Sequence, residues 1–122
     1  MTTLSFTANE VGVVNDEYTL IASVGVSDPV QYVTLQRTVA DGEDDWGIHF
    51  EFNDQINGKY ECIKSCSLTR DHLLVELTEP IDTKKEVHSV DVSLEISEDD
   101  HEALTAMLLR IFRGKLDLLR VQ

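Results

Sequence analysis

The chain has 122 residues, a length that fits a single domain (residues 1–122) with one hydrophobic core. It carries 23 acidic and 10 basic residues, for a formal net charge of −13, and 42% of its residues are hydrophobic. This excess of acid argues against nucleic acid and against an anionic membrane surface as partners, because both are bound through clustered Lys and Arg.

The N-terminal sequence predicts no targeting segment. It has no basic stretch followed by an apolar one, so it is unlike a secretory signal. No run approaches the ~20 apolar residues that span a bilayer. On one strand, Cys62 and Cys66 would lie about 13 Å apart, too far for a disulfide. These features favour a cytoplasmic protein with two free thiols.

The first third of the chain predicts strands. Residues 4–14 are expected to form a hairpin or a bent strand, followed by strands at 18–26 and 30–39. Ser27-Asp28-Pro29 separates the last two. Arg37 falls among the apolar side chains of the 30–39 strand, which weakens the assignment of its buried face.

The clearest alternation lies in residues 46–52. Four large apolar side chains, including Trp46, share one face, and His49 and Glu51 share the other. Strand geometry places the Cβ atoms of His49 and Glu51 about 7 Å apart, so the pair could act as general base and orienting group. A solvated sheet face is the favoured interpretation, because no third group stands at a fixed spacing.

The next segments predict a hairpin and two further strands. Asn57-Gly58 is typical of a tight turn, because both central positions of a type I′ turn need positive φ. The returning strand covers residues 60–69, where Lys64 interrupts the apolar face and indicates a bulge or burial on both faces. Residues 72–78 and 86–96 alternate cleanly and predict strands with one buried face.

A single helix follows, with Ser97 as its N-cap and Gly114 as its C-terminal stop. An apolar stripe recurs at helical spacing: Leu104, Met107, Leu108, Ile111 and Phe112. Residues 115–122 are expected to form a short strand or an extended tail. The predicted fold class is α+β: one antiparallel sheet of about six to eight strands with the C-terminal helix packed on one face.

Two metal-site motifs are incomplete. His101-Glu102 begins like the zinc motif H-E-x-x-H, but Thr105 stands where the second His should be. Asp41–Asp45 resembles the start of a calcium loop, yet Trp46 and Phe52 occupy the positions of its glycine and its bidentate Glu. We therefore predict no metal ligands.

The two cysteines are also weak candidates for chemistry. A reactive thiolate usually needs an electropositive niche or a helix N-terminus, whereas Cys62 and Cys66 lie on a predicted strand of an acidic protein. Small buried hydrophobes are the better interpretation. Phosphate-binding glycine motifs are missing as well. We predict no catalytic residues and no cofactor.

Six acidic residues crowd the ends and the outer face of the 46–52 strand. They are Asp41, Glu43, Asp44, Asp45, Glu51 and Asp54. One interpretation is a solvated loop that keeps the protein soluble. The other is a docking surface for a basic partner, since opposed charges raise association rates and add specificity.

Four segments carry a resemblance to a known family. They are Trp46-Gly-Ile-His-Phe-Glu-Phe-Asn-Asp-Gln55, Asn57-Gly-Lys-Tyr60, Leu68-Thr-Arg-Asp-His-Leu-Leu-Val-Glu-Leu77 and Leu109-Arg-Ile-Phe112. Together they resemble immunity protein family 10 of bacterial polymorphic toxin systems, over about residues 39–112. The resemblance implies a small cytoplasmic α+β immunity protein, encoded beside a toxin, that protects its producer by binding the toxin domain. These motifs are structural, so they transfer no active site.

The absence of a catalytic constellation and the large negative charge suit occlusion of a basic toxin face. Since nucleases must attract phosphate, a nuclease-type toxin is the partner that the charge favours. Two alternatives stay open: a small cytosolic enzyme that uses His49, Glu51 or a cysteine, and a homo-oligomeric binding or scaffold domain formed by edge-strand pairing. The sequence does not decide the oligomeric state.

Overall fold

A computed structural model of the chain describes residues 2–16, 18–38, 47–81 and 86–122. Within these ranges the strands form two five-stranded sheets, accompanied by one α-helix. In spatial order, sheet A contains β1 (Thr2–Ala8), β9 (Val87–Leu94), β8 (His72–Ile81), β7 (Ile63–Leu68) and β10 (Leu119–Val121). Sheet B contains β2 (Glu10–Asn15), β3 (Thr19–Ser27), β4 (Val30–Thr38), β5 (Ile48–Phe52) and β6 (Asp54–Tyr60).

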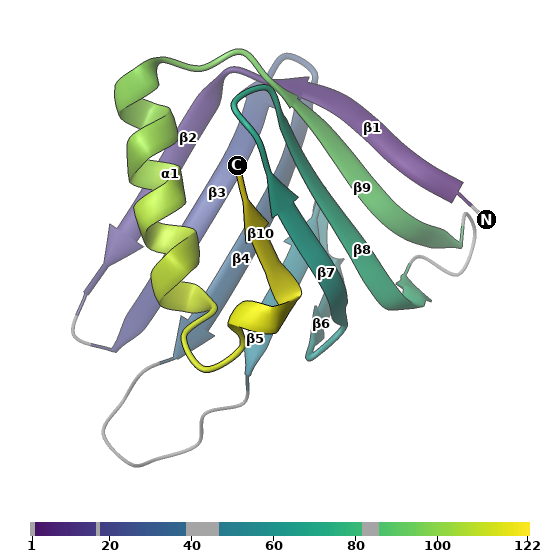
Figure 1. The fold of residues 1–122 in the computed structure, drawn as a ribbon. Coiled ribbons are helices and arrows are strands. Elements are labelled where there is room, and N and C mark those ends of the chain that lie inside the picture. The colour runs from purple at the N-terminus through teal and green to yellow at the C-terminus, as the bar shows by residue number, and fades with distance from the viewer. Residues whose placement is uncertain (1, 17, 39–46, 82–85) are drawn as a thin grey trace.

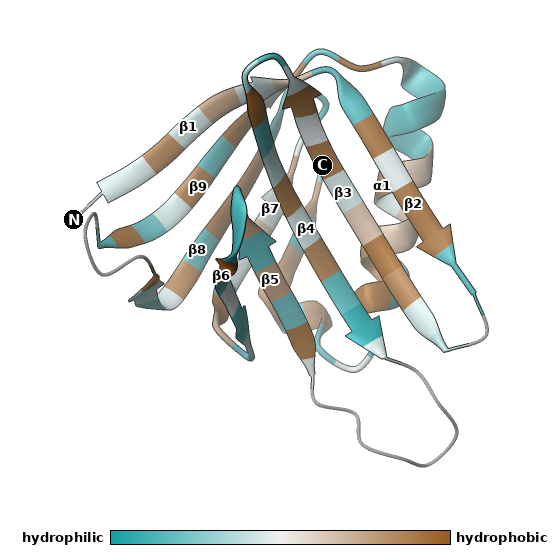
Figure 2. Ribbon diagram, turned by 180° about the vertical axis from the view of Figure 1, so that it is seen from behind, coloured by the Kyte–Doolittle hydropathy of each residue, from teal (hydrophilic) through white to brown (hydrophobic). Residues whose placement is uncertain are grey.

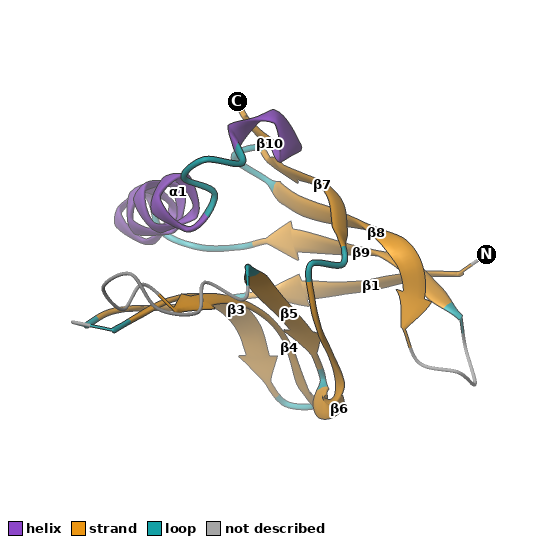
Figure 3. Cartoon of the chain, turned by 90° about the horizontal axis from the view of Figure 1, so that it is seen from below, coloured by secondary structure: helices purple, strands orange, loops and turns teal. Residues whose placement is uncertain are grey.

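The elements form two layers (Figures 1 and 3). Sheet B makes one layer, and sheet A together with α1 (Glu98–Ile111) makes the other. The helix packs on β2, β3 and β4. Sheet A and α1 therefore cover the same face of sheet B, and Figure 3 shows no described helix or strand on its opposite face.

The chain passes from sheet A to sheet B between Ala8 and Asn9. The Ala8 carbonyl accepts from the Glu95 N–H at 2.9 Å, beside β9, and the Asn9 N–H donates to the Gly25 carbonyl of β3 at 3.0 Å. β1 and β2 belong to different sheets and are not paired with each other. Of the two expected arrangements for residues 4–14, the bent strand is thus the correct one.

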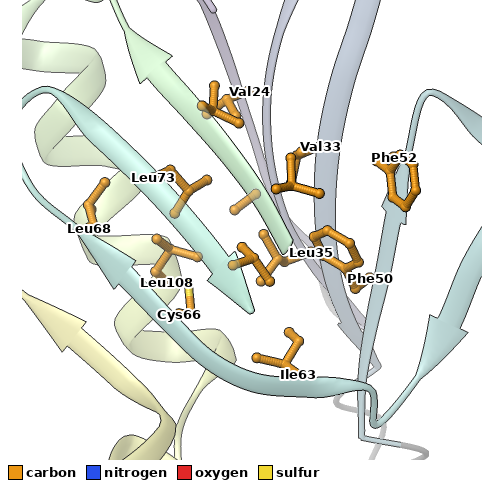
Figure 4. Close-up of a cluster of buried hydrophobic side chains, with 14 of the residues drawn as sticks. Val24, Val33, Leu35, Phe50, Phe52, Ile63, Cys66, Leu68, Leu73 and Leu108 are labelled. Atoms are coloured by element: carbon orange, nitrogen blue, oxygen red, sulfur yellow. The ribbon is translucent and has the colours of Figure 1, made fainter. Parts of the chain in front are cut away.

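Apolar side chains from both sheets and the helix meet between the layers. Figure 2 shows the alternation of hydrophobic and hydrophilic residues along β3, β4 and β5. In the close-up of Figure 4, Leu35 and Phe50 of sheet B lie near Leu73 of sheet A and Leu108 of α1, and all four are fully buried. Each such side chain stabilises the fold by about 1.5–3 kcal/mol relative to exposure.

The predicted helix is confirmed. The Ser97 hydroxyl accepts from the Asp100 N–H at 3.1 Å, and the first turn is acidic, as the helix dipole favours. Gly114 adopts φ +81° just after the helix, where the chain turns away. The five predicted stripe residues are all buried: Leu104, Met107, Leu108, Ile111 and Phe112. In the described ranges, no helix combines the length and apolar character that a bilayer crossing needs.

The α+β class is confirmed, but the predicted single antiparallel sheet of six to eight strands is wrong. There are two sheets, and the pairs β1–β9 and β10–β7 are parallel. The alternation of a strand indicates which of its faces is buried, but not which sheet it joins or what covers it. The helix covers only part of sheet B, at β2, β3 and β4, and sheet A packs beside it on the same face.

The turn predicted at Asn57-Gly58 is also wrong. The chain reverses at Asn53, which has φ 61°, and Asn57 and Gly58 lie inside β6. Gly58 is in register with Glu51, and the Asn57 side-chain amide donates to the Phe52 carbonyl at 3.1 Å. Asparagine tolerates the left-handed conformation, so the reversal needs no glycine.

Two expectations left open are settled by the structure. Lys64 falls at a shift of register between Ile63 and Ser65, so the bulge interpretation is correct. The last residues form a short 3₁₀ helix, η1 (Leu116–Leu118), and then β10, which pairs in parallel with β7. The end of the chain is therefore an edge strand of sheet A.

Candidate functional site: the open face of sheet B

Sheet B presents a face that no described helix or strand covers, which we call the open face. It consists of the even-numbered residues of β2 and β4, the odd-numbered residues of β3 and β5, and Gly58 and Tyr60 of β6. The alternate side chains, such as Ala22, Leu35 and Phe50, are buried against sheet A and α1. Along each strand, the side chains therefore alternate between the core and the open face.

Tyr32 and Glu51 form a hydrogen-bonded pair on this face. The Tyr32 hydroxyl donates to Glu51 Oε2 at 2.5 Å, and the Tyr32 N–H donates to the Asn53 side chain at 2.9 Å. Partial burial and the neighbouring Glu51 carboxylate raise the pKa of Tyr32 to about 12. The hydroxyl therefore stays protonated near neutral pH and holds the carboxylate in one orientation.

His49 and Tyr60 stand side by side in the next row of the open face. They are in register on β5 and β6, and their rings meet edge to face with centroids 4.8 Å apart. Gly58 makes room for this contact, since a Cβ there would lie 2.9 Å from His49 Cε1. Edge-to-face packing fixes the ring orientations.

The predicted placement of His49 and Glu51 on one face is confirmed, but their contacts lead to different neighbours. Glu51 accepts from Tyr32 of β4, whereas His49 packs on Tyr60 of β6. The arrangement holds two separate pairs, each joining adjacent strands. These contacts supply aromatic surface and a fixed carboxylate on an open sheet.

The charge of the open face is negative. Glu10 and Glu51 belong to it, and among its described residues there is no Lys or Arg. Lys59 of β6 is in register with buried Phe50, and its Nζ lies 3.7 Å from Glu79 of β8, on the side of sheet A. This surface is therefore suited to a cationic partner.

A depression of about 350 Å³ lies at the end of the open face beside the β3–β4 turn. Glu10, Gly25 and Tyr32 stand in one row there, on adjacent strands. The Ser27 hydroxyl lies 3.0 and 2.9 Å from the two Glu10 carboxylate oxygens. Gly12 and Ser23, in the next row, also line the depression, so its floor is made of small residues.

The structure describes only part of the predicted acidic cluster. Glu51 lies on the open face, and Asp54 begins β6, where its carboxylate accepts from the Ile56 N–H at 3.2 Å. The other four residues, Asp41, Glu43, Asp44 and Asp45, lie outside the described residues, as does Trp46. The two described members stand near one end of β5.

Tyr32 and Glu10 are site residues that sequence reasoning missed. Tyr32 alternates with the apolar residues of β4, so its place on an outer face was readable. Its contact with Glu51 depends on the register of β4 against β5, and the row of Glu10 depends on that of β2 against β3. The alternation within one strand does not indicate how that strand is aligned with its neighbour.

Both cysteines are free and buried. Burial raises the pKa of Cys66 to about 12, and burial also raises the pKa of Cys62 to about 11. Raised thiol pKa values oppose formation of the thiolate, which is the nucleophilic form. The interpretation as small core residues fits these surroundings.

The other histidines lie apart from the open face. On sheet A, His72 Nδ1 lies 3.1 Å from Asp91 Oδ1. His88 Nδ1 donates to the Glu86 carbonyl at 2.8 Å, and His101 Nε2 donates to the Thr69 carbonyl at 3.0 Å. In the part of the chain that the structure describes, no three His, Cys, Asp or Glu side chains form a group that could hold a metal ion.

Comparison with models of protein families finds no match, and comparison with curated proteins finds none either. The resemblance to an immunity-protein family therefore stays a prediction.

Proposed function

We propose that the chain is an immunity protein that binds a cognate bacterial toxin domain and neutralises it by stoichiometric occlusion. The open face is the surface that we assign to this contact. One observation carries the proposal: this face combines Tyr32, Tyr60 and two carboxylates, with no described Lys or Arg. Tyrosines are enriched among the residues that dominate binding energy at protein interfaces.

The size of the face supports a protein partner. Five strands at ~4.8 Å spacing span about 20 Å, which approaches the width of an interface that buries about 800 Å² per partner. The depression is shallow, and Gly12 and Gly25 at its floor offer backbone and no side chain. A broad, shallow, aromatic and acidic surface suits another protein better than a small enclosed substrate.

The charge of the face supports a basic partner, and a nuclease-type toxin in particular. A domain that attracts phosphate carries clustered Lys and Arg, and the net charge of −13 would draw it into encounter. The bond from Tyr32 orients Glu51 for such contact. Since a carboxylate accepts several hydrogen bonds, Glu51 keeps capacity for a donor on the partner.

Co-expression in bacteria with the toxin domain encoded beside the gene tests the function. The wild-type chain should restore growth, and failure to restore it would refute the immunity role. Glu51→Lys should reduce rescue, because it places a cation on the proposed contact surface. Glu76→Lys is the matched control: Glu76 is also half-buried, in register with Ser89 on the outer face of sheet A, and should still rescue.

Binding of the purified pair should weaken steeply as salt rises, because the contact pairs opposite charges at an exposed surface. Calorimetric titration at about 0.05 M and about 0.5 M salt measures this, and a loss of roughly tenfold or more is expected. An affinity that stays constant would contradict the basic partner while leaving rescue of growth as evidence for immunity. Equal rescue by Glu51→Lys and wild type would contradict the open face as the binding surface.

A further inference from the structure

The depression on the open face has two different walls over a floor of small residues. In one row of the depression, Glu10 of β2 and Tyr32 of β4 flank Gly25 of β3. With ~4.8 Å between neighbouring strands, the backbones that carry Glu10 and Tyr32 stand about 10 Å apart. Gly25 adds no side chain between these two residues.

We propose that this depression is a slot for one arginine side chain of the partner, with Glu10 as the carboxylate wall and Tyr32 as the aromatic wall. The inference deepens the proposed function and rests on the partner being a basic protein. A guanidinium is planar and presents paired N–H donors that match a carboxylate. It also interacts favourably with an aromatic ring, so the two walls fit two properties of the same group.

The glycines explain why the slot stays open. A Cβ on Gly25 would lie 2.8 Å from the Gln31 carbonyl oxygen and 3.2 Å from Tyr32 Cβ, so this position is closed to larger residues by the backbone itself. Gly12, at the adjacent floor position, has no atom within 4 Å of an added Cβ. A larger side chain at Gly12 would therefore extend into free space over the slot without a steric conflict.

The Glu10 carboxylate is bonded to Ser27 but can still accept hydrogen bonds from a guanidinium. The Ser27 hydroxyl reaches both Glu10 oxygens, and one hydroxyl proton uses little of the four-fold accepting capacity of a carboxylate. Among the described residues that line the depression, there is no Lys or Arg. An incoming guanidinium would meet no described cation of this chain in the slot.

Titration of the isotope-labelled full chain with N-acetyl-arginine methylamide, followed by backbone amide NMR, tests the slot. Saturable shifts are expected at the amides of Gly12, Gly25 and Ser27. The neutral isostere N-acetyl-citrulline methylamide should bind about tenfold more weakly, as should the Glu10→Gln variant with the arginine probe. Gly12→Val should abolish the shifts by filling the slot.

Glu76→Gln loses the same charge on sheet A and should bind the arginine probe as the wild type does. The amide spectra of all variants report whether they are folded. Equal shifts from the arginine and citrulline probes, unchanged affinity in Glu10→Gln, or shifts that map to another surface would overturn the slot. The lysine analogue, which lacks the planar fork, should bind more weakly than arginine, and equal binding would overturn the preference for a guanidinium.

Growth rescue separates this inference from the proposed function. If the chain neutralises the toxin but does not bind the arginine probe, the immunity function is supported and the arginine slot is contradicted. If the chain binds the probe through Glu10 but does not neutralise the toxin, the slot is supported and the immunity role is contradicted. If both hold, Gly12→Val should weaken rescue while the matched variant Gly12→Ala, with its small side chain, weakens it less.

Discussion

The guanidinium of Arg37 in β4 donates to the main-chain oxygen of Ile111, the last residue of α1, at 2.8 Å. The same nitrogen donates to the Arg113 carbonyl at 2.6 Å. Carbonyls in the last turn of a helix lack intrahelical donors, and the negative end of the helix dipole lies there. A cation on the inner side of β4 thus joins sheet B to the end of α1.

Arg37→Met should destabilise the protein by about 2 kcal/mol, because two carbonyls, one of them in a partly buried hydrogen bond, lose a charged donor while the aliphatic stem is kept. Urea unfolding followed by circular dichroism measures the loss. Arg37→Lys should fall between wild type and Arg37→Met, since an ammonium keeps the charge without the planar fork. Arg120→Met, at an exposed position of β10, is the control and should stay within about 0.5 kcal/mol of wild type.

Ser97→Ala should cost about 1 kcal/mol of unfolding free energy, because the Asp100 N–H loses its acceptor at the start of α1. Ser97→Asp should retain most of the stability, since a carboxylate caps the same N–H and favours the helix dipole. Thermal unfolding of the three proteins in one buffer provides the comparison. Unchanged stability in Ser97→Ala would show that the cap contributes nothing to the folded state.

Gly25→Ala and Gly12→Ala form a matched pair on the open face. At Gly25, the new Cβ would lie 2.8 Å from the Gln31 carbonyl oxygen, so backbone must shift, at a cost of about 1–3 kcal/mol. At Gly12, nothing lies within 4 Å, and Ala should leave stability unchanged or raise it by a few tenths of a kcal/mol, about the entropy that glycine loses on folding. Equal melting temperatures for the two variants would contradict this local geometry.

Stability should fall as pH rises above about 9. Burial raises the pKa of Cys66 from its ordinary value of 9.0 to about 12, so between these values the unfolded chain releases a proton that the folded chain keeps. This contribution to the free energy of unfolding is fully present below pH 9, and on the order of 1 kcal/mol of it is lost by pH 10. Urea unfolding at pH 8 and pH 10 measures the difference.

Cys66→Ala isolates this thiol from other groups that titrate in alkali. The variant should be less stable than wild type at both pH values, because a core residue is truncated. Its loss of stability between pH 8 and pH 10 should be smaller than that of wild type by on the order of 1 kcal/mol. An identical loss in both proteins would mean that Cys66 does not contribute to the pH dependence.

Periodicity along the chain predicted individual elements well and their assembly poorly. The Ser97 cap, the helical stripe and the buried faces of β5, β8 and β9 follow from local spacing. The division into two sheets does not, because a strand buried on one face has the same pattern whether a helix or another sheet covers it. Arg37 showed this limit: a cation on an apolar face was unexplained until α1 supplied its acceptors.

The candidate site was likewise predictable only in part. The shared face of His49 and Glu51 was readable from alternation, and it is present. Tyr32 and Glu10 could not be joined to them, since their neighbours depend on the register of each strand against the next, which alternation within one strand does not indicate. The turn at Asn57-Gly58 was predicted from residue preference, yet Asn53 provides the positive φ instead.

The crossing at Ala8 and Asn9 bears on how the molecule unfolds. Successive residues hydrogen-bond to Glu95 beside β9 and to Gly25 of β3, so one continuous segment is a member of both layers. Opening of either sheet at this point displaces a segment that is also bonded to the other sheet. We therefore expect amide hydrogen exchange in β3 and β9 to proceed through a common global opening, with similar protection in both layers.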